Sequence, residues 1–162
     1  MRTAENSPTL NHEGESASIR NILAVSVGTL AVVVGLAAGM AVNMALVMLN
    51  GYVLFPMPEG MDMYDPQQMN TYVATLPTAA FFIVLAAHLG QSFVGGWVAA
   101  RFGSSRPMLL AMIVGLVSLA GGIMNMMTIE GPDWMYIELP LYLVVAWMAG
   151  RIEVKRRAAV FG

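Results

Sequence analysis

The chain has 162 residues, of which 57% are hydrophobic and 11% are charged, and its formal net charge is −2. So few charged residues cannot cover the surface of a soluble domain of this size, so the composition indicates a membrane protein. The chain has no cysteine, which excludes disulfides, thiolate metal sites and thiol–disulfide chemistry.

The N-terminal segment, residues 1–20, is polar and rich in Ser, Asn and Glu, and we expect it to be a disordered cytoplasmic tail. An apolar segment follows over residues 22–50. It is too long for the apolar region of a cleaved signal peptide, so we expect a retained span. Its 29 residues would form a helix of about 43 Å, whereas a hydrocarbon core is about 30 Å thick. This helix must therefore tilt or protrude from the membrane.

An outer connection is expected over residues 51–76, because its first ten residues hold two prolines and two glycines. Within it, Asp65 precedes Pro66, and Gln68 follows three residues after the aspartate. This pattern predicts an N-cap, a proline in the first turn and a capping-box partner. We therefore expect a short outer surface helix from Pro66, or an extension of the next span that begins there.

The rest of the chain alternates apolar segments with short connections. Three further spans are expected, over residues 77–100, 107–128 and 134–150. The last is short, with 17 residues, and carries Pro140. Four spans with short connections predict an all-α integral membrane protein over residues 21–151, folded as an antiparallel four-helix transmembrane bundle. Residues 152–162 are expected to form a basic cytoplasmic tail.

Basic and acidic residues separate between the connections. All eight Lys and Arg residues lie in the two terminal tails or in the turn between the second and third spans. The other two connections hold acids and no base, and those acids are Glu59, Asp62, Asp65, Glu130 and Asp133. The positive-inside rule therefore predicts a multi-pass protein with both termini cytoplasmic and the acidic connections outside.

Small residues recur at the spacing of helix faces. Gly35 and Gly39 form a GxxxG pattern, and similar patterns occur in the second and third spans. Small residues let the backbones of neighbouring membrane helices approach closely. We therefore expect close helix packing at Gly28, Gly35, Gly39, Gly95, Gly96, Gly115 and Gly122.

Polar side chains also occur inside the predicted spans. His88 precedes Arg101 by 13 residues, and Glu138 precedes Arg151 by 13 residues. Both therefore lie roughly 20 Å from the basic ends of their helices, at one level of the bundle. The candidate polar layer comprises His88, Gln91, Ser92, Glu138, Tyr142, Asn43 and Asn125.

Two interpretations of His88 and Glu138 are open. As a functional pair they would relay a proton or contact a ligand, since ionisable residues inside membranes are often functional. As structural residues, Glu138 would be solvated near the outer interface and a neutral His88 would bond a neighbouring helix. Such interhelical polar contacts contribute about 0.6 kcal/mol. The sequence favours the structural interpretation, because charged groups are commoner near an interface than deep in lipid.

No metal or cofactor is predicted. Met57, Met61 and Met63 in the outer connection are candidate Cu(I) ligands, because thioethers are soft. Methionine also commonly fills apolar helices, and this spacing is not diagnostic. His88 is the single histidine of the spans, so one chain has no histidine pair for haem. No nucleophile–base–acid set, phosphate-cradling loop or nucleic-acid signature is present, so we expect no nucleic-acid binding and the sequence does not favour catalysis.

Several local motifs together carry a resemblance. They are residues 52–62, His88, Gly95-Gly96, Arg106-Pro107, residues 121–125 and Pro132-x-Trp134. In these motifs the chain, over residues 22–151, is similar to a family of small, uncharacterised, four-span bacterial inner-membrane proteins. The resemblance implies a four-span fold in a bacterial inner membrane. It brings no activity and no catalytic residues.

The sequence therefore predicts a structural or accessory membrane protein that packs in the lipid bilayer against itself or another membrane protein. One alternative is a proton- or cation-coupled transporter-like protein that uses Glu138 and His88. Another is a membrane enzyme with its site in the outer polar layer. If the small-residue helix faces all pack inside the bundle, little of them remains for contact with a partner protein. A cavity that opens outward and is lined by His88 and Glu138 would favour transport.

Overall fold

The computed structural model describes residues 8–161, and all regular structure in this range is helical. The helices are α1 (Pro8–Met48), α2 (Pro66–Val73), α3 (Thr78–Phe102), α4 (Pro107–Thr128) and α5 (Glu138–Phe161). A π-helical segment, η1 (Leu49–Leu54), continues α1, and a 3₁₀ segment, η2 (Asp133–Ile137), leads into α5. The predicted all-α class is confirmed.

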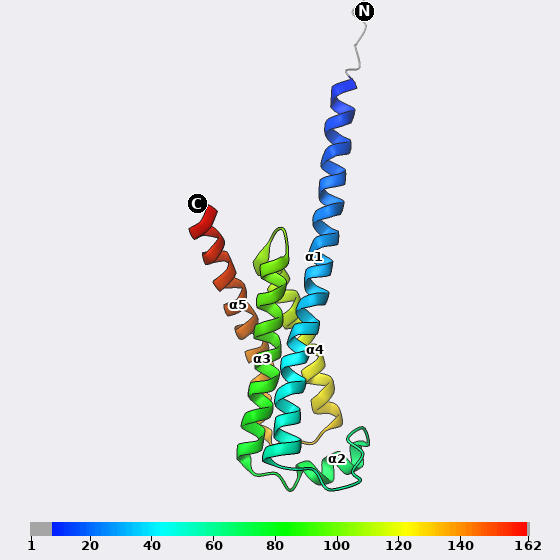
Figure 1. The fold of residues 1–162 in the computed structure, drawn as a ribbon, viewed down its shortest axis with the longest axis vertical. Helices are drawn as coiled ribbons and strands as arrows, with labels where there is room; N and C mark the ends of the chain where they lie inside the picture. Colours follow the sequence, from blue (N-terminus) through cyan, green and yellow to red (C-terminus); the bar gives the residue numbers. More distant parts are fainter. Residues whose placement is uncertain (1–7, 162) are drawn as a thin grey trace, which may run out of the picture.

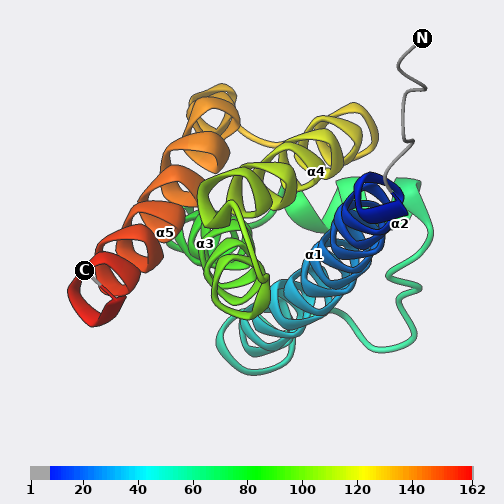
Figure 2. The same cartoon turned by 90° about the horizontal axis from the view of Figure 1, so that it is seen from above.

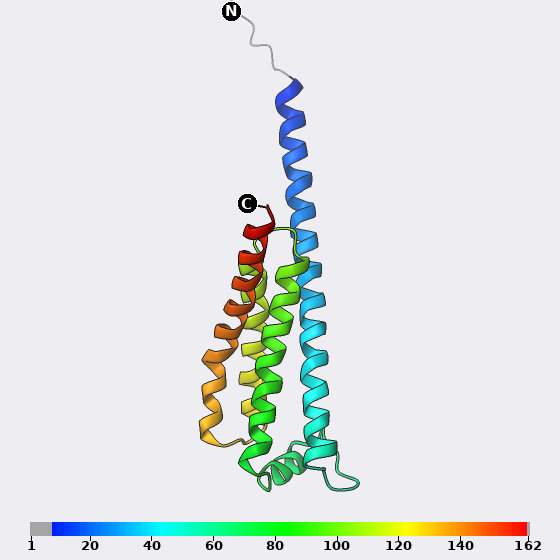
Figure 3. The same ribbon diagram turned by 60° about the vertical axis from the view of Figure 1, so that its left-hand side comes forward.

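Four long helices lie side by side and alternate in direction along the chain (Figures 1 and 3). Helix α3 packs against α1, α4 and α5, and α4 also packs against α5, so α3 is the central helix (Figure 2). The α3–α4 turn and the C-terminal end of α5 lie at one end of the molecule, which we call the basic end (Figure 1). Helix α2 and the α4–α5 connection lie at the other, which we call the acidic end.

Within residues 8–161, three stretches are long and apolar enough to cross a membrane: Glu15–Leu54, Thr78–Phe102 and Pro107–Thr128. They indicate a membrane-associated protein. Helix α5 differs from them because its apolar part lies between two charged positions, Glu138 at its start and Arg151 thirteen residues later. Its uncharged stretch is therefore shorter than those of the other three long helices.

The helices extend beyond several predicted boundaries. Helix α1 begins at Pro8, so residues 8–20 are helical where we expected a disordered tail; residues 1–7 of that tail lie outside the described part of the chain. Proline suits the first turn of a helix, so Pro8 can begin α1. The next proline is Pro56, so no proline interrupts the helix before its end. At the other terminus α5 continues to Phe161, so the expected basic tail is also helical over most of its length. Neither terminal segment contains a proline that would end its helix earlier.

The start of α2 matches its predicted cap. Asp65 Oδ1 accepts hydrogen bonds from the backbone N–H groups of Gln67 at 2.9 Å and Gln68 at 3.3 Å. The Gln68 side chain donates to Asp65 Oδ2 at 2.9 Å and accepts from the backbone N–H of Asp62 at 3.0 Å. In a capping box the Gln68 side chain would accept instead from the N–H of Asp65 itself. The side-chain bond from Gln68, followed by the backbone bonds, holds the pKa of Asp65 below its usual value of 3.8.

Replacing Asp65 with alanine should loosen the first turn of α2. Two backbone donors would lose their acceptor, and the loss of such a cap should raise amide exchange in this helix about fivefold. Hydrogen exchange of the purified protein, followed by mass spectrometry, measures the effect. Asp65→Asn keeps a capping oxygen and serves as the control. Equal exchange in all three proteins would contradict the assignment.

The predicted packing glycines all face neighbouring helices. A Cβ added to Gly35 on α1 would lie 2.5 Å from the Gly95 carbonyl oxygen of α3, and one added to Gly95 would lie 2.8 Å from that of Gly35. The two backbones therefore meet directly, as small residues permit. The others would each place a Cβ within 4 Å of another helix, and they are Gly28, Gly39, Gly96, Gly115 and Gly122. These small faces are used inside the fold.

Candidate functional site

His88 and Glu138 meet between α3 and α5. His88 Nδ1 lies 3.0 Å from Glu138 Oε2. The Glu138 side chain has no exposed area, and that of His88 is 12% exposed. Glu138 is the first residue of α5. We call these two residues the His88–Glu138 pair.

Tyr142 completes this cluster from one turn along α5. Its hydroxyl donates to Glu138 Oε1 at 3.4 Å, and its ring stacks with that of His88 at a centroid distance of 6.3 Å. Gly122 of α4 makes room for the ring, since a Cβ there would lie 2.5 Å from Tyr142 Cε2. Ser92 on α3 donates its hydroxyl to the Tyr142 carbonyl at 2.9 Å. The cluster thus holds the imidazole and the carboxyl in fixed positions.

The remaining residues of the predicted polar layer lie elsewhere. The Asn43 amide of α1 donates to Gln91 Oε1 of α3, which forms a second polar contact at the α1–α3 interface. Asn125 is exposed near the end of α4 and lines the cavity described below, which the His88–Glu138 pair also lines. The predicted layer is therefore divided, because the Asn43–Gln91 contact is separate from the cavity whereas Asn125 lies at it. Counting residues along a helix gives the level of a side chain but not the neighbour that it faces.

A cavity of about 870 Å³ lies at the acidic end. It is lined by residues of α1, α2, α3, α4, η2 and the neighbouring connections, and the His88–Glu138 pair is part of the lining. On α3 the lining residues are Phe81, Val84 and His88, so His88 is the one farthest from the acidic end. Tyr64, which also lines the cavity, is 85% exposed. The cavity therefore opens at the acidic end and extends inward to the pair.

The candidate soft metal ligands do not converge on one place. Met63 lines the large cavity, whereas Met61 lines a smaller one beside α2. Met57 packs near Gly51 in η1 and lines neither cavity. Within the described residues, no cluster of three or more His, Asp or Glu side chains is arranged to hold a metal ion.

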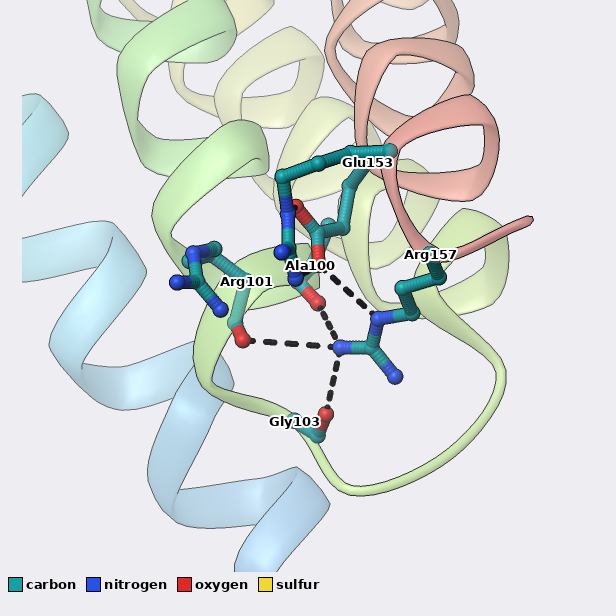
Figure 4. A network of polar contacts seen from close by, with 6 residues as sticks. Ala100, Arg101, Gly103, Glu153 and Arg157 are labelled. Carbon is teal, nitrogen blue, oxygen red and sulfur yellow. Dashed lines mark hydrogen bonds and ion pairs between the residues drawn. The ribbon is translucent and has the colours of Figure 1, made fainter. Parts of the chain in front are cut away.

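A second buried acid, Glu153, lies at the basic end and was not singled out from the sequence. Its side chain has no exposed area and accepts two bonds of 2.7 Å from Arg156 and one of 2.9 Å from Arg157. The Arg157 guanidinium also donates to the carbonyls of Ala100 at 2.6 Å and Gly103 at 2.7 Å, where α3 ends (Figure 4). Arg157 therefore caps α3 from α5.

Charge pairing controls the protonation of this basic-end cluster. Hydrogen bonds from Arg156, and then from Arg157, lower the pKa of Glu153 from 4.5 to about 2, although burial acts in the opposite direction. The pKa of Arg156 is raised by its bond to Glu153. The sequence signal was the acid placed three and four residues before two arginines, the spacing of one helix face. These residues belong to the segment for which the sequence predicts a basic cytoplasmic tail, yet they contact the end of α3.

Comparison with known proteins gives no function for the site at the acidic end, so its chemistry is argued from its residues. No family model, curated protein or solved structure matches the chain. A carboxyl that is hydrogen-bonded to an imidazole can pass a proton to it or accept one from it. Because His88 lines the cavity and is 12% exposed, water or a ligand in the cavity reaches the pair through the imidazole, whereas the Glu138 side chain has no exposed area.

Proposed function

We propose that the protein is a small, proton-coupled, transporter-like membrane protein that binds its ligand in the cavity and exchanges a proton at the His88–Glu138 pair. One observation carries the proposal: a fully buried carboxyl lies 3.0 Å from an imidazole, and both groups line an open cavity. Ionisable groups inside membrane segments are costly, and they commonly mark ligand or proton pathways.

The proposal includes four spans, with α5 and η2 supplying the fourth. Residues 133–150 precede the first base of α5 and pack beside α3 and α4. The bases of the α3–α4 turn and of α5 gather at the basic end, which the positive-inside rule assigns to the cytoplasm together with both termini. The cavity then faces outward, which in a bacterial inner membrane is the periplasm.

The packing of the glycines supports transport over the accessory role that the sequence favoured. A small-residue face left free would have favoured that role, but the predicted packing glycines contact other helices of the same chain, which leaves little of these faces for a partner. The accessory role stays as the second candidate because α1 has an exposed apolar face, which includes Val25, Leu30 and Val33. The same experiment separates the two candidates.

Proton uptake into proteoliposomes, driven by an imposed membrane potential and followed with an internal pH dye, tests the proposal. The wild type should exceed protein-free liposomes. Glu138→Gln should fall to their level, because a glutamine at this buried position cannot carry the proton. Glu59→Gln is the matched control, since Glu59 is exposed and lies outside the large cavity, and it should behave as the wild type. Background uptake in all three proteins would overturn the proposal and leave the accessory role.

A further inference from the structure

The charge on the cavity lining selects the sign of a ligand. Glu138 lies at its inner end, and Glu130 and Asp133 lie near the acidic end. No Lys or Arg is among the described residues that line the cavity. Charged residues of one sign that line a cleft with low-dielectric walls raise the local concentration of ions of the opposite sign. The cavity therefore attracts cations and repels anions.

The apolar part of the lining selects the body of the ligand. Most lining residues are apolar, and among them are Phe81, Val84, Met124, Met126 and Met135. Flexible thioethers adapt to ligands of different shape and contact aromatic groups favourably. A hydrated inorganic cation would need several oxygen ligands, and the described residues offer no such cluster. A volume of about 870 Å³ is suited to a drug-sized molecule.

We infer that the cavity binds a lipophilic organic cation, such as an amphipathic amine or an onium ion, with its charge directed at Glu138 and its apolar body against the methionine and aromatic lining. The faces of Tyr64 and Tyr136, which also line the cavity, attract cations. This inference names the ligand class of the site in the proposed function, and so it rests on that proposal for its biological meaning.

Binding of the cation then releases a proton from the His88–Glu138 pair. The N–H bond of the protonated His88 imidazole breaks, its electron pair stays on the ring nitrogen, the proton leaves to water in the cavity, and the charge of the cation compensates the carboxylate of Glu138. The titratable groups that face Glu138 are His88 from α3 and Tyr142 from its own helix. Helix α4 contributes no titratable residue to the lining, and Glu130 and Asp133 lie toward the acidic end. The cation should therefore bind more weakly as the pH falls.

Tetraphenylphosphonium is a suitable probe, because it is lipophilic and its charge cannot be lost as a proton. Calorimetry on the purified full chain in detergent, repeated in two buffers of different ionisation enthalpy, gives affinity and proton release together. We expect one saturable site, about one proton released per cation bound, and about a tenfold weaker affinity per pH unit where the pair is protonated. Neutral triphenylphosphine oxide should bind far more weakly.

Three variants sharpen this experiment. Glu138→Gln should weaken cation binding and remove its proton release. Glu130→Lys changes an exposed residue of the lining, so it leaves the helices intact and should weaken binding of the cation several-fold without affecting the neutral analogue. Glu59→Gln lies outside the cavity and should bind as the wild type.

The outcomes distinguish this inference from the proposed function. Proton uptake that depends on Glu138, without saturable cation binding, would overturn the ligand class and leave the function. Equal binding of the neutral analogue, or binding unaffected by Glu130→Lys, would also overturn it. Saturable cation binding without proton uptake would support the ligand class and overturn the proposed transport.

Discussion

Replacing Glu153 with glutamine should lower the free energy of unfolding by about 2 kcal/mol at neutral pH, because solvent around the partly exposed Arg156 screens part of the charge pairing. The pKa of this carboxyl is lowered from 4.5 to about 2 in the folded chain, chiefly by its bonds to Arg156. Each pKa unit corresponds to about 1.4 kcal/mol of preference for the charged form. Glutamine has the shape of the protonated acid and lacks that preference, so it should lose the charge-dependent part of the interaction.

The same carboxyl should make the stability of the wild type depend on pH in acid. Because its pKa is lower in the folded chain than in the unfolded chain, its contribution is fully present above about pH 4.5 and is lost as the pH falls toward 2. In Glu153→Gln this contribution is already absent, so the difference in stability between the two proteins should shrink across that interval. Denaturant titration of the purified proteins at a series of pH values measures both effects.

Glu59→Gln is the matched control for this prediction. It makes the same chemical change at an exposed position of the acidic end, where solvent screens the charge, so its stability should stay close to that of the wild type. A Glu153→Gln protein as stable as the wild type at neutral pH would show that the cluster adds nothing to the fold. A difference that stayed constant down to pH 2 would show that its effect does not come from the charge.

Helix starts marked by local signals were predictable from the sequence. Pro66 begins α2, as the Asp-Pro pair indicated, and α4 begins at Pro107, the first residue predicted for the third span. The outer limits of α1 and α5 were not, because polar residues beyond a span can extend its helix when no proline stops it. Composition indicates that such a segment is hydrophilic, and it does not indicate whether that segment is helical.

The candidate site was also predictable only in part. Counting from the basic ends placed His88 and Glu138 at one level, and the structure has them in contact. The same counting could not show that Gln91 bonds Asn43 on α1, because contacts between helices depend on how each helix is rotated. Glu153 was missed for a related reason: its role depends on α5 continuing past the span and on the end of α3 lying beside it.

Replacing Gly35 with alanine should lower the free energy of unfolding by about 3 kcal/mol, the upper end of the range for overpacking. The added methyl carbon would lie 2.5 Å from the Gly95 carbonyl oxygen and 2.9 Å from Ala99 Cβ. Both belong to α3 itself rather than to the tip of a flexible side chain, so the two helices must separate. Gly121→Ala is the control, because a Cβ there would meet no atom within 4 Å. It should be neutral or should stabilise helix α4 by up to about 1 kcal/mol.

The contact between Gly35 and Gly95 is reciprocal, which gives the prediction a second, more specific form. A Cβ on Gly95 would lie 2.8 Å from the Gly35 carbonyl oxygen, so either alanine forces the same separation of α1 from α3. Once one substitution has moved the helices apart, the second enters space that is already open. The double variant should therefore cost clearly less than the sum of the two single variants, in the non-additive way of residues that share one contact. Additive losses in denaturant titrations of the four proteins would mean that the two glycines do not share a contact and that α1 packs against α3 in some other register.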